Sequence, residues 1–336
     1  MDKAAERVMR NEMLEMISGC WSTQIAGVAC RFRIPDLLAP GPRTAADVAA
    51  AIDAPADPAR RLLRAMCALD LARQLDADRF ELTPRGVLLR SDVPGSMSGL
   101  AQSWIGRQWT SWALLEQGIR TGKPTVGGFE TVAADPEAAV VINQAQADRS
   151  RLPAAEIART YDWSRFKRLL DVGGGYGTVL STVLRAHPNM TGAVLDLAYH
   201  EDRARTAMAA EGVADRADFI GGSFFESVPS GFDCYLMKSI IHDWADAESH
   251  TILANTAKAA GKGGTVLIVD QVLPEIADAD PANHSAFRTD ITMLLGTGGC
   301  ERTEAEFAAL LKGAGLKLQR IIANDSEFRV IEAIVD

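Results

Sequence analysis

The stretch LLDVGGGYGTV, residues 169–179, runs from apolar residues through a single acid into a cluster of glycines. Glycine loses more conformational freedom on folding than any other residue, so such a cluster indicates a backbone that turns tightly or approaches a ligand closely. The preceding apolar residues predict a buried strand over 168–173, which places the glycine turn at the carboxyl end of that strand.

The spacing of this turn differs from both common phosphate-binding loops. In neither register do glycines occupy all three positions of G-x-G-x-x-G, and no lysine follows as a P-loop requires. The pattern present is D-x-G-x-G-x-G, from Asp171 through Gly173 and Gly175 to Gly177. Such a turn lets the backbone lie close to a small molecule, and the acid before it can meet a cationic or amine group.

The next predicted strand, GAVLDL at 192–197, contains Asp196 near its carboxyl end. An acid at the end of the second strand, about 20 residues beyond the turn, suits the hydroxyl groups of a ribose. A ribose-binding acid combined with a turn that lacks phosphate-binding features predicts a nucleoside without phosphates, and S-adenosylmethionine is such a nucleoside. The alternative is an ordinary tight turn followed by a surface acid.

Short apolar runs alternate with helical patterns over residues 165–336. This alternation predicts an α/β fold with a doubly wound, mostly parallel sheet. Only two residues separate the last two predicted strands, too few for a helical crossover, so we expect that pair to be antiparallel. The predicted strands are 168–173, 191–196, 217–221, 232–237, 264–270, 316–324 and 327–335.

The N-terminal half has a mostly helical pattern. Thr44 and Asp47 form a capping-box pattern, Asp57 predicts the N-cap of a second helix, and a hairpin is predicted over 72–83. Helix, helix and hairpin in this order resemble a winged helix, which often binds DNA. Three arginines lie on the second helix, but residues 1–110 are close to neutral, and a solvated helix face explains the arginines at least as well.

The composition is that of a globular protein: of the 336 residues, 47% are hydrophobic and 24% are charged. The net charge of −9 lacks the basic excess of a nucleic-acid-binding protein. No stretch approaches the roughly 20 apolar residues of a membrane span. The five cysteines are scattered without C-x-x-C spacing, so we expect reduced thiols, no zinc site and a cytoplasmic location.

Six motifs occur in an order that resembles the caffeic-acid-type O-methyltransferases, including bacterial members from aromatic antibiotic pathways. The motifs are LLDVGGGYG, GAVLDL, GGSFFESVP, LMKSIIHDWADAES, IVDQVLP and GGCERTEAEF. The resemblance covers nearly the whole chain. It implies a mostly helical, winged-helix-like dimerisation domain over 1–100, a helical connecting region over 101–160 that lines the acceptor pocket, and a Rossmann-like catalytic domain over 161–336.

The resemblance also implies an activity. The expected enzyme is a homodimer that methylates a hydroxyl of a small aromatic natural product in secondary metabolism, and converts S-adenosylmethionine to S-adenosylhomocysteine. No aspartate cluster resembles a magnesium site, so we expect no metal in the mechanism.

A general base is useful for this reaction, because a phenol with a pKa of about 10 is largely protonated at neutral pH. Of the five histidines, only His242 lies just past the carboxyl end of a predicted central strand, where open α/β sheets bind ligands. The resemblance makes His242 the base and brackets it with Asp270 and Glu301. Plant members usually have Glu in place of Asp270. Glu301 could instead cap the following helix, although Thr303 suits that cap better.

By the same resemblance, the methionine end of the cofactor packs against Gly173 and the ribose binds Asp196. Phe224 covers the adenine, with Ser223 beside it where the family usually has Asp. The remaining predicted cofactor contacts are Lys238 and Ser150, the latter at the methionine carboxylate.

The acceptor site is predicted from residue type and position. Asp243 either contacts the acceptor or cofactor, or caps the next helix. Arg149, where plant members have His, either favours an acceptor with a carboxylate or faces solvent. The three tryptophans of the connecting region suit stacking on a planar aromatic, or else ordinary packing between the two halves. The candidates for the acceptor wall are Trp104, Trp109, Trp112, Ile142 and Met293.

Two rival functions stay open on the sequence. An N- or C-methyltransferase on the same scaffold would not need His242. A non-catalytic, cofactor-sensing regulator would bind DNA through its winged helix, with a steep salt dependence and no turnover.

Overall fold

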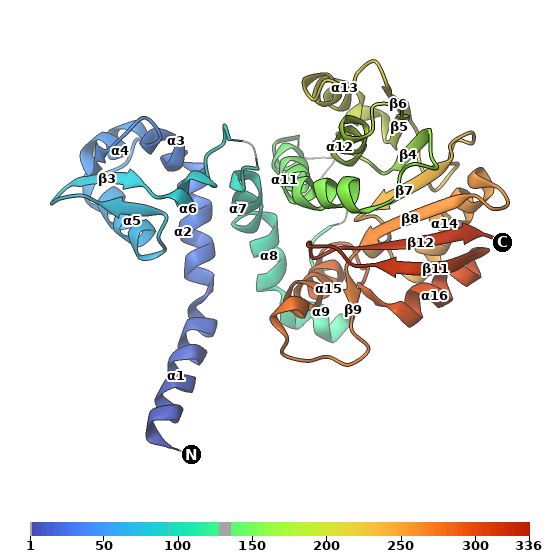
Figure 1. Cartoon of the computed structure of the whole chain (residues 1–336). Coiled ribbons are helices and arrows are strands. Elements are labelled where there is room, and N and C mark those ends of the chain that lie inside the picture. The colour runs from blue at the N-terminus through green and yellow to red at the C-terminus, as the bar shows by residue number, and fades with distance from the viewer. Residues whose placement is uncertain (1, 94, 128–135) are drawn as a thin grey trace. The chain divides into compact units, whose positions relative to one another are not determined.

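The computed structural model describes residues 2–93, 95–127 and 136–336, which pack as two compact units (Figure 1). Unit 1 comprises Met1–Trp109 and Glu137–Asp148, and unit 2 comprises Thr110–Pro136 and Arg149–Asp336. The connecting region expected over 101–160 is divided between them. Two of its helices, α8 (Arg107–Ala113) and α11 (Pro136–Thr160), have residues in both units.

Unit 1 is mostly helical and contains one small sheet. The strands β1 (Arg43–Thr44), β2 (Ala72–Gln74) and β3 (Arg79–Leu82) pair antiparallel in the order β1-β3-β2. The predicted order of helix, helix and hairpin is present as α4, α5 and β2–β3. The helices are α1 (Lys3–Ser18), α2 (Cys20–Arg31), α3 (Ile34–Leu38), α4 (Ala45–Ala51), α5 (Ala56–Ala68), α6 (Pro84–Val87) and α7 (Ser98–Trp104).

The two predicted helix starts in unit 1 have different outcomes. The capping box is confirmed, because Thr44 Oγ1 accepts the Asp47 amide at 3.1 Å and the Asp47 carboxylate accepts the Thr44 amide. The N-cap predicted at Asp57 is wrong: helix α5 begins at Ala56, directly after an extended Pro55. Asp57 instead lies in the first turn, where it opposes the positive end of the helix dipole and pairs with Arg61 at 2.8 Å.

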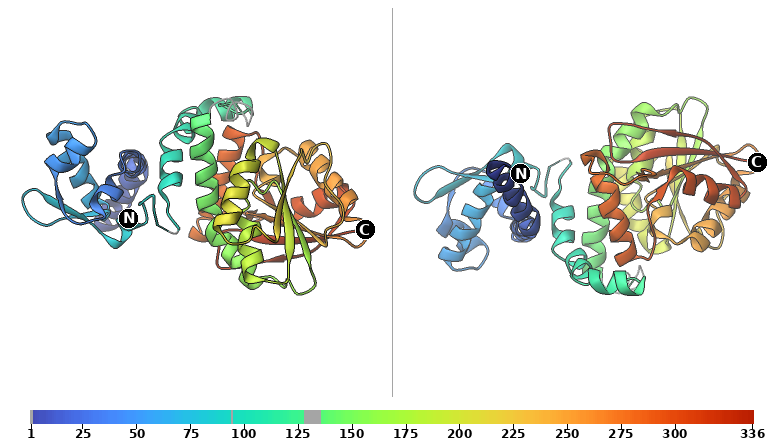
Figure 2. Two further views of the ribbon diagram at one scale, coloured as in Figure 1. Left: turned by 90° about the horizontal axis from the view of Figure 1, so that it is seen from above. Right: turned by 90° about the horizontal axis from the view of Figure 1, so that it is seen from below.

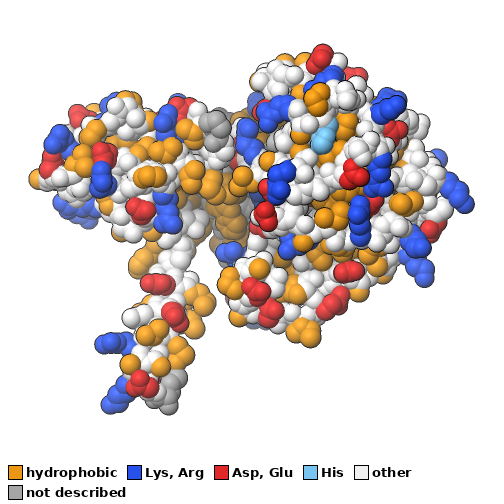
Figure 3. Space-filling view, in the orientation of Figure 1, with side chains coloured by type: hydrophobic (Ala, Val, Ile, Leu, Met, Phe, Trp, Pro, Cys, Tyr) orange, Lys and Arg blue, Asp and Glu red, His pale blue; other side chains and the backbone are white. Residues whose placement is uncertain are grey.

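Helix α1 has no buried residue in the chain as described. None of the described helices is both long enough and apolar enough to cross a membrane. The apolar side chains of α1 therefore lie on the surface of the chain, and a large exposed apolar surface is typical of a protein interface. The exposed apolar side chains of α1 are Val8, Met9, Met13, Leu14, Met16 and Ile17. Figure 3 shows hydrophobic side chains along this N-terminal helix.

Unit 2 contains a seven-stranded sheet in the order β11-β12-β8-β7-β4-β5-β6. All seven predicted strands are present, and the last two are antiparallel as expected. The strands are β4 (Arg168–Val172), β5 (Thr191–Asp196), β6 (Ala217–Gly221), β7 (Cys234–Lys238), β8 (Thr265–Asp270), β11 (Leu316–Ile322) and β12 (Arg329–Val335). The helices are α9 (Leu115–Thr121), α12 (Thr178–Ala186), α13 (Glu201–Ala210), α14 (Asp246–Ala260), α15 (His284–Gly296) and α16 (Glu304–Gly313).

The central strands are buried on both faces. Along β4, Leu169 packs with one hydrophobic cluster and Leu170 with another, and Leu236 and Met237 of β7 divide in the same way. The first cluster includes residues of α11, α12 and α13, and the second includes residues of α14 and α16, so helices cover both faces of the sheet (Figure 2). This three-layer packing explains why these strands have continuous apolar runs.

The order of the strands reverses between β4 and β7. The chain proceeds outward from β4 through β5 to β6, and then returns to place β7 on the other side of β4. Such a switch point leaves a crevice at the carboxyl ends of the two strands, where open α/β sheets bind ligands. The glycine turn follows β4 and the segment that holds His242 follows β7, so both predicted sites lie at this switch point.

Candidate active site

The histidine segment leaves β7 through an unusual backbone conformation. Ser239 has a φ of 56°, in the left-handed region that few residues other than glycine adopt. One turn of 3₁₀ helix, η2 (Ile241–Asp243), follows and contains His242. No regular α-helix or strand therefore fixes this histidine, and its position depends on contacts with other segments.

A buried dyad forms between His242 and Glu301. The Nδ1 atom of His242 is 2.8 Å from Glu301 Oε1, and both side chains are almost completely buried. Asp270 plays a different part, because its Oδ2 accepts the backbone N–H of His242 at 3.3 Å. Of the two acids predicted to bracket the histidine, Glu301 contacts the ring and Asp270 contacts the backbone.

Burial makes the carboxyl groups around this histidine harder to ionise. It raises the pKa of Glu301 to about 8, and the pKa of Asp243 and of Asp270 to about 6. One oxygen of Asp270 and one of Glu301 are buried without a hydrogen-bond partner in the described part of the chain. Strongly perturbed carboxyl groups in one place are typical of a functional site.

The dyad fixes which ring nitrogen can accept a proton. Once Glu301 is ionised its oxygens can only accept hydrogen bonds, so the proton of the short contact belongs to Nδ1. Nε2 is then left with its lone pair, in the tautomer that a general base requires. Asp243 Oδ1 lies 3.7 Å from Nε2, close enough to stabilise the imidazolium ion that forms when Nε2 takes a proton.

The glycine turn leaves room for a ligand beside one part of its backbone. Gly173 has a φ of 73°, and a Cβ atom there would lie 2.4 Å from the Ile240 side chain. Gly175 has a φ of 55°, and beyond Gly175 itself and its two chain neighbours no described atom lies within 4 Å of the place where its Cβ would be. The turn is therefore tightly packed at Gly173 and open at Gly175, so the residues present fit the predicted cofactor.

Asp196 lies at the carboxyl end of β5, beside this turn. Its Oδ2 accepts the Gly175 amide at 2.7 Å and its Oδ1 accepts the Leu197 amide at 2.7 Å. Each carboxylate oxygen has further acceptor capacity, which a ribose diol can use.

Asp171 lies beneath the turn. The carboxyl accepts the Leu180 amide at 3.3 Å, and a Cβ at Gly174 would lie 2.6 Å from it. Burial raises the pKa of Asp171 to about 7. These contacts give Asp171 a role in shaping the turn, and direct contact with a bound cationic group stays a prediction.

The other predicted cofactor residues come from three separate segments. The Phe224 ring would lie 3.4 Å from a Cβ at Gly173, so it borders the turn, while the Ser223 hydroxyl accepts the Phe225 amide. Lys238 is buried, and its Nζ donates to Ser150 Oγ at 3.1 Å. Burial lowers the pKa of this lysine to about 7.

The predicted acceptor residues are divided between the units. Trp104, Trp109 and Ile142 belong to unit 1, and their place in an acceptor wall stays a prediction. Trp112, Arg149, Asp243 and Met293 belong to unit 2 with the dyad, and Met293 is a buried residue of α15.

Two of these acceptor candidates have defined surroundings. Asp243 does not cap α14, because that helix begins at Asp246 after Ala245 and has no side-chain cap. Arg149 lies 3.4 Å from Glu327 and donates to Thr289 Oγ1 at 3.3 Å, so it already has a carboxylate partner.

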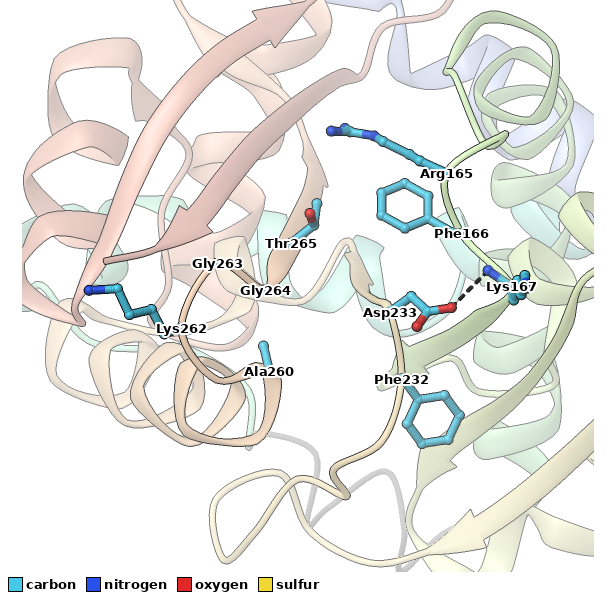
Figure 4. Close-up of a pocket in the computed structure, with 10 residues that line it drawn as sticks. All are labelled: Arg165, Phe166, Lys167, Phe232, Asp233, Ala260, Lys262, Gly263, Gly264 and Thr265. Atoms are coloured by element: carbon cyan, nitrogen blue, oxygen red, sulfur yellow. Dashed lines mark hydrogen bonds between the residues drawn. The ribbon is translucent and has the colours of Figure 1, made fainter.

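A separate hollow lies at the opposite edge of the sheet. It is a shallow, open hollow of about 590 Å³ near the amino ends of β4, β7 and β8 (Figure 4). Its lining includes Arg165, Lys262 and Asp233, and the Asp233 carboxylate accepts the Lys167 amide at 2.8 Å. None of the predicted site residues lines this hollow.

No group of three or more His, Cys, Asp or Glu in the described part of the chain is arranged to hold a metal ion.

Three residues of the site were not singled out from the sequence. Asp290 Oδ1 accepts the Glu301 amide at 3.0 Å, and the buried Arg302 donates to the carbonyl groups on both sides of His242. A Cβ at Gly299 would lie 2.1 Å from the His242 carbonyl oxygen. Gly299 and Arg302 are part of the quoted motif GGCERTEAEF, but an arginine beside a glutamate there is indistinguishable from a solvated one.

Comparison with known proteins agrees with this geometry. Residues 112–317 match the O-methyltransferase domain, and residues 14–92 match the O-methyltransferase dimerisation domain. The chain belongs to the O-methyltransferase family. Its members use S-adenosylmethionine, and the described turn and the adjacent Asp196 fit that cofactor.

Relatives similar to this chain come from bacterial secondary metabolism. The phenazine O-methyltransferase PhzM of Lysobacter antibioticus is 35% identical, over 96% of this chain and 95% of its own. The O-demethylpuromycin-O-methyltransferase of Streptomyces alboniger is 34% identical, over 95% and 87%. The 8-amino-8-demethylriboflavin N,N-dimethyltransferase of Streptomyces davaonensis is 32% identical, over 90% and 88%.

Solved structures show the same fold. The crystal structure of LaPhzM has a TM-score of 0.93 and 34% identity, and covers 98% of this chain and 99% of its own. NcsB1, from neocarzinostatin biosynthesis, was solved in complex with S-adenosylmethionine and 2-hydroxy-5-methyl naphthoic acid. It has a TM-score of 0.78 and 31% identity, and covers 94% of this chain and 96% of its own.

We expect Asp196→Asn to weaken cofactor binding by about 10- to 100-fold, because hydrogen bonds to a charged group contribute roughly 1.5–3 kcal/mol. Isothermal titration with S-adenosylmethionine and S-adenosylhomocysteine measures the effect. Asp218→Asn is a matched control on the exposed end of the neighbouring strand, where Asp218 pairs with Arg205. Equal affinities for both variants would argue against Asp196 as the ribose ligand.

We expect kcat/KM to rise with pH and to level off above about pH 8. The folded-state pKa of Glu301 is raised by burial, so the carboxylate that fixes the Nδ1 proton is present only as pH rises through this value. Glu301→Gln removes that titration, and the rise near pH 8 should disappear while the rate falls by about 10- to 100-fold. The control is Glu304→Gln, because Glu304 is an exposed glutamate three residues further along the chain, at the start of α16. A Glu301→Gln profile with an unchanged rise would contradict this assignment.

Proposed function

We propose that this protein is a cytoplasmic enzyme that methylates a hydroxyl of a small aromatic molecule, with His242 as the general base. The observation that supports this proposal most directly is the 2.8 Å contact between His242 Nδ1 and Glu301 Oε1, at the switch point where the glycine turn also lies. Bound S-adenosylmethionine supplies the methyl group as an electrophile.

The protein's own residues handle the proton. His242 Nε2 takes the proton of the acceptor hydroxyl, while the oxygen of that hydroxyl bonds to the transferred methyl group. The ring then carries a positive charge, which Glu301 at Nδ1 and Asp243 near Nε2 stabilise. Loss of that proton to solvent returns the dyad to its starting state, with S-adenosylhomocysteine as the second product.

Relatives support an aromatic acceptor, since one is named as a phenazine O-methyltransferase and another as a naphthoate O-methyltransferase. The surroundings of Arg149 allow a carboxylate on that acceptor. Its guanidinium lies 5.6 Å from the Phe328 ring centroid and is about a quarter exposed, and its present partner is Glu327. An acceptor carboxylate would have to replace Glu327 as that partner. Hydroxyaryl acids are therefore the first acceptors to test.

N-methylation is the second candidate, because the relative from Streptomyces davaonensis is named for dimethylating an amino group. An amine with a low pKa is neutral at pH 7 and needs no base before it accepts a methyl group. The requirement for His242 therefore separates the two reactions.

We expect His242→Ala to slow methyl transfer by about 10²-fold or more, because general-base catalysis typically contributes 10²–10⁴-fold. The enzyme would be given S-adenosylmethionine with an isotopically labelled methyl group and a mixture of phenols, hydroxybenzoates, hydroxynaphthoates and hydroxyphenazines. Mass spectrometry then identifies the labelled product and its position.

His250→Ala is the control. His250 is an exposed histidine of α14, and its Nε2 lies 2.8 Å from the Gly313 carbonyl oxygen. Label on an aromatic oxygen, with only His242→Ala slowed, supports the proposal. Label on nitrogen, or full activity of His242→Ala, would favour the second candidate.

We also propose that the enzyme is a homodimer formed through α1 and α2, because the match to a dimerisation domain begins within α1 and this helix exposes its apolar side chains. Replacing Leu14 and Ile17 together by lysine should weaken the dimer by about 100-fold or more, since burying unpaired charges is unfavourable by several kcal/mol. Light scattering after gel filtration measures the mass. Ile276→Lys, at an exposed apolar residue of unit 2, is the control, and an unchanged mass for the double variant would refute this interface.

A further inference from the structure

We infer that Arg302 is a positioning residue that fixes the backbone of His242 relative to the backbone of Glu301. This inference rests on the proposed function, in which His242 is the base, but its evidence is separate. That evidence is the hydrogen bonding of one buried guanidinium group and the close approach of two backbone segments.

The Arg302 side chain is about 3% exposed and bonds to both sides of the histidine segment. Its Nη1 donates to the Ile241 carbonyl at 3.2 Å, and its Nη2 donates to the Trp244 carbonyl at 3.0 Å. These two residues enclose His242 and Asp243 in the sequence. The guanidinium therefore fixes the start and the end of the segment whose backbone no regular element supports.

The same group is fixed in turn by helix α14. Arg302 donates to Asp246 Oδ1 at 2.8 Å and to Ser249 Oγ at 3.3 Å. Ser249 is fully buried, and the single hydrogen of its hydroxyl is within hydrogen-bond distance of two carbonyl groups, at 3.3 Å for Ile241 and 3.1 Å for Trp244. The Asp246 carboxylate is mostly exposed, so the buried carbonyl groups, rather than the ion pair, determine how firmly the segment is held.

Arg302 follows Glu301 directly in the chain, so this bonding also sets the position of the acid. Residues Arg302–Thr303 form the short strand β10, which pairs in parallel with β9 (Val272–Leu273), two residues beyond Asp270. Asp290 holds the Glu301 amide. The backbone of Glu301 is therefore fixed from two sides, and Arg302 connects it to the backbone of His242.

The two segments also touch without any side chain between them. A Cβ atom at Gly299 would lie 2.1 Å from the His242 carbonyl oxygen and 2.4 Å from the Asp243 carbonyl carbon. Any other residue there would push the histidine segment away from the segment of Glu301. Gly299 sets how closely the segments approach, and Arg302 sets their register.

Lysine cannot replace this arginine. The guanidinium offers five donors in a planar fork, and here they reach acceptors on Ile241, Trp244 and α14 at once. The ammonium group of lysine concentrates three donors at one point, so at least one of these two carbonyl groups would lose its hydrogen bond to residue 302. A displacement of about 1 Å in a catalytic group can lower a rate by about 10²-fold.

The test compares Arg302→Lys, Arg302→Ala and Gly299→Ala with the control Arg165→Lys. Arg165 is an exposed arginine that pairs with the buried Glu332 away from the switch point, so substituting it alters an arginine ion pair without touching the dyad. Titration with S-adenosylhomocysteine confirms that each variant is folded. We expect kcat to fall by about 10- to 100-fold for all three test variants, while the KM for S-adenosylmethionine changes by less than about 2-fold.

Two further measurements separate positioning from a general structural role. The proton NMR resonance of the His242 Nδ1–H, assigned by its loss in His242→Ala, should weaken or disappear in Arg302→Ala. Added guanidinium chloride should restore both this resonance and part of kcat, whereas ammonium chloride at the same ionic strength should restore neither. If Arg302→Ala does not fold, the same resonance in Arg302→Lys and Gly299→Ala decides the question.

Unchanged kcat in folded Arg302 variants would overturn the inference. A lowered kcat with an unchanged Nδ1–H resonance would also overturn it, because the dyad would then be intact. Full activity of His242→Ala would instead refute the proposed function, and the resonance would still report whether Arg302 holds the two side chains together.

Discussion

The hydrogen bond between His242 and Glu301 joins segments that lie 59 residues apart in the chain. Such a contact forms only if two loops are brought to the same depth at the same edge of the sheet. Strands β7 and β8 provide the edge, because His242 follows one and Asp270 ends the other. The short pairing of β9 with β10 then brings Glu301 alongside. The rest of unit 2 can be understood as the support that this one contact requires.

That support has an electrostatic cost. Asp171, Asp243, Asp270 and Glu301 are all buried at or near the switch point, with Lys238 as a buried cation, and burial opposes the charged form of each. A sheet edge optimised for stability alone would replace these groups with apolar side chains. Their presence together means that the site accepts reduced stability in exchange for groups whose protonation changes near neutral pH. Cofactor binding can recover part of this cost, because a ligand that binds only the folded state stabilises it.

Much of the fold could be predicted from the sequence, because the signals are local. The apolar runs identified all seven strands of the large sheet, and the two-residue gap between the predicted strands 316–324 and 327–335 indicated the antiparallel pair. Residues at strand ends, such as Asp196 and His242, could be located for the same reason. Contacts between distant loops left no local signal. From the sequence, Arg302 cannot be told from a solvated arginine. Which of Asp270 and Glu301 contacts the histidine ring, and which contacts its backbone, depends on geometry that only the folded chain contains.

The described arrangement also separates chemistry from acceptor choice. The glycine turn follows β4, Asp196 ends β5 and His242 follows β7, so neighbouring parallel strands of unit 2 place all three, and the sheet leaves them little freedom. Apart from Asp243, which follows His242 directly, the candidate acceptor residues lie on helices. Among them are Met293 on α15, and Trp112 and Arg149 on α8 and α11, the two helices that have residues in both units. A helix can shift, or exchange one side chain for another, without disturbing the strand ends. Changes on these helices can therefore alter which aromatic molecule is accepted and leave the proton transfer intact, which is why the reaction could be inferred from motifs while the acceptor could not.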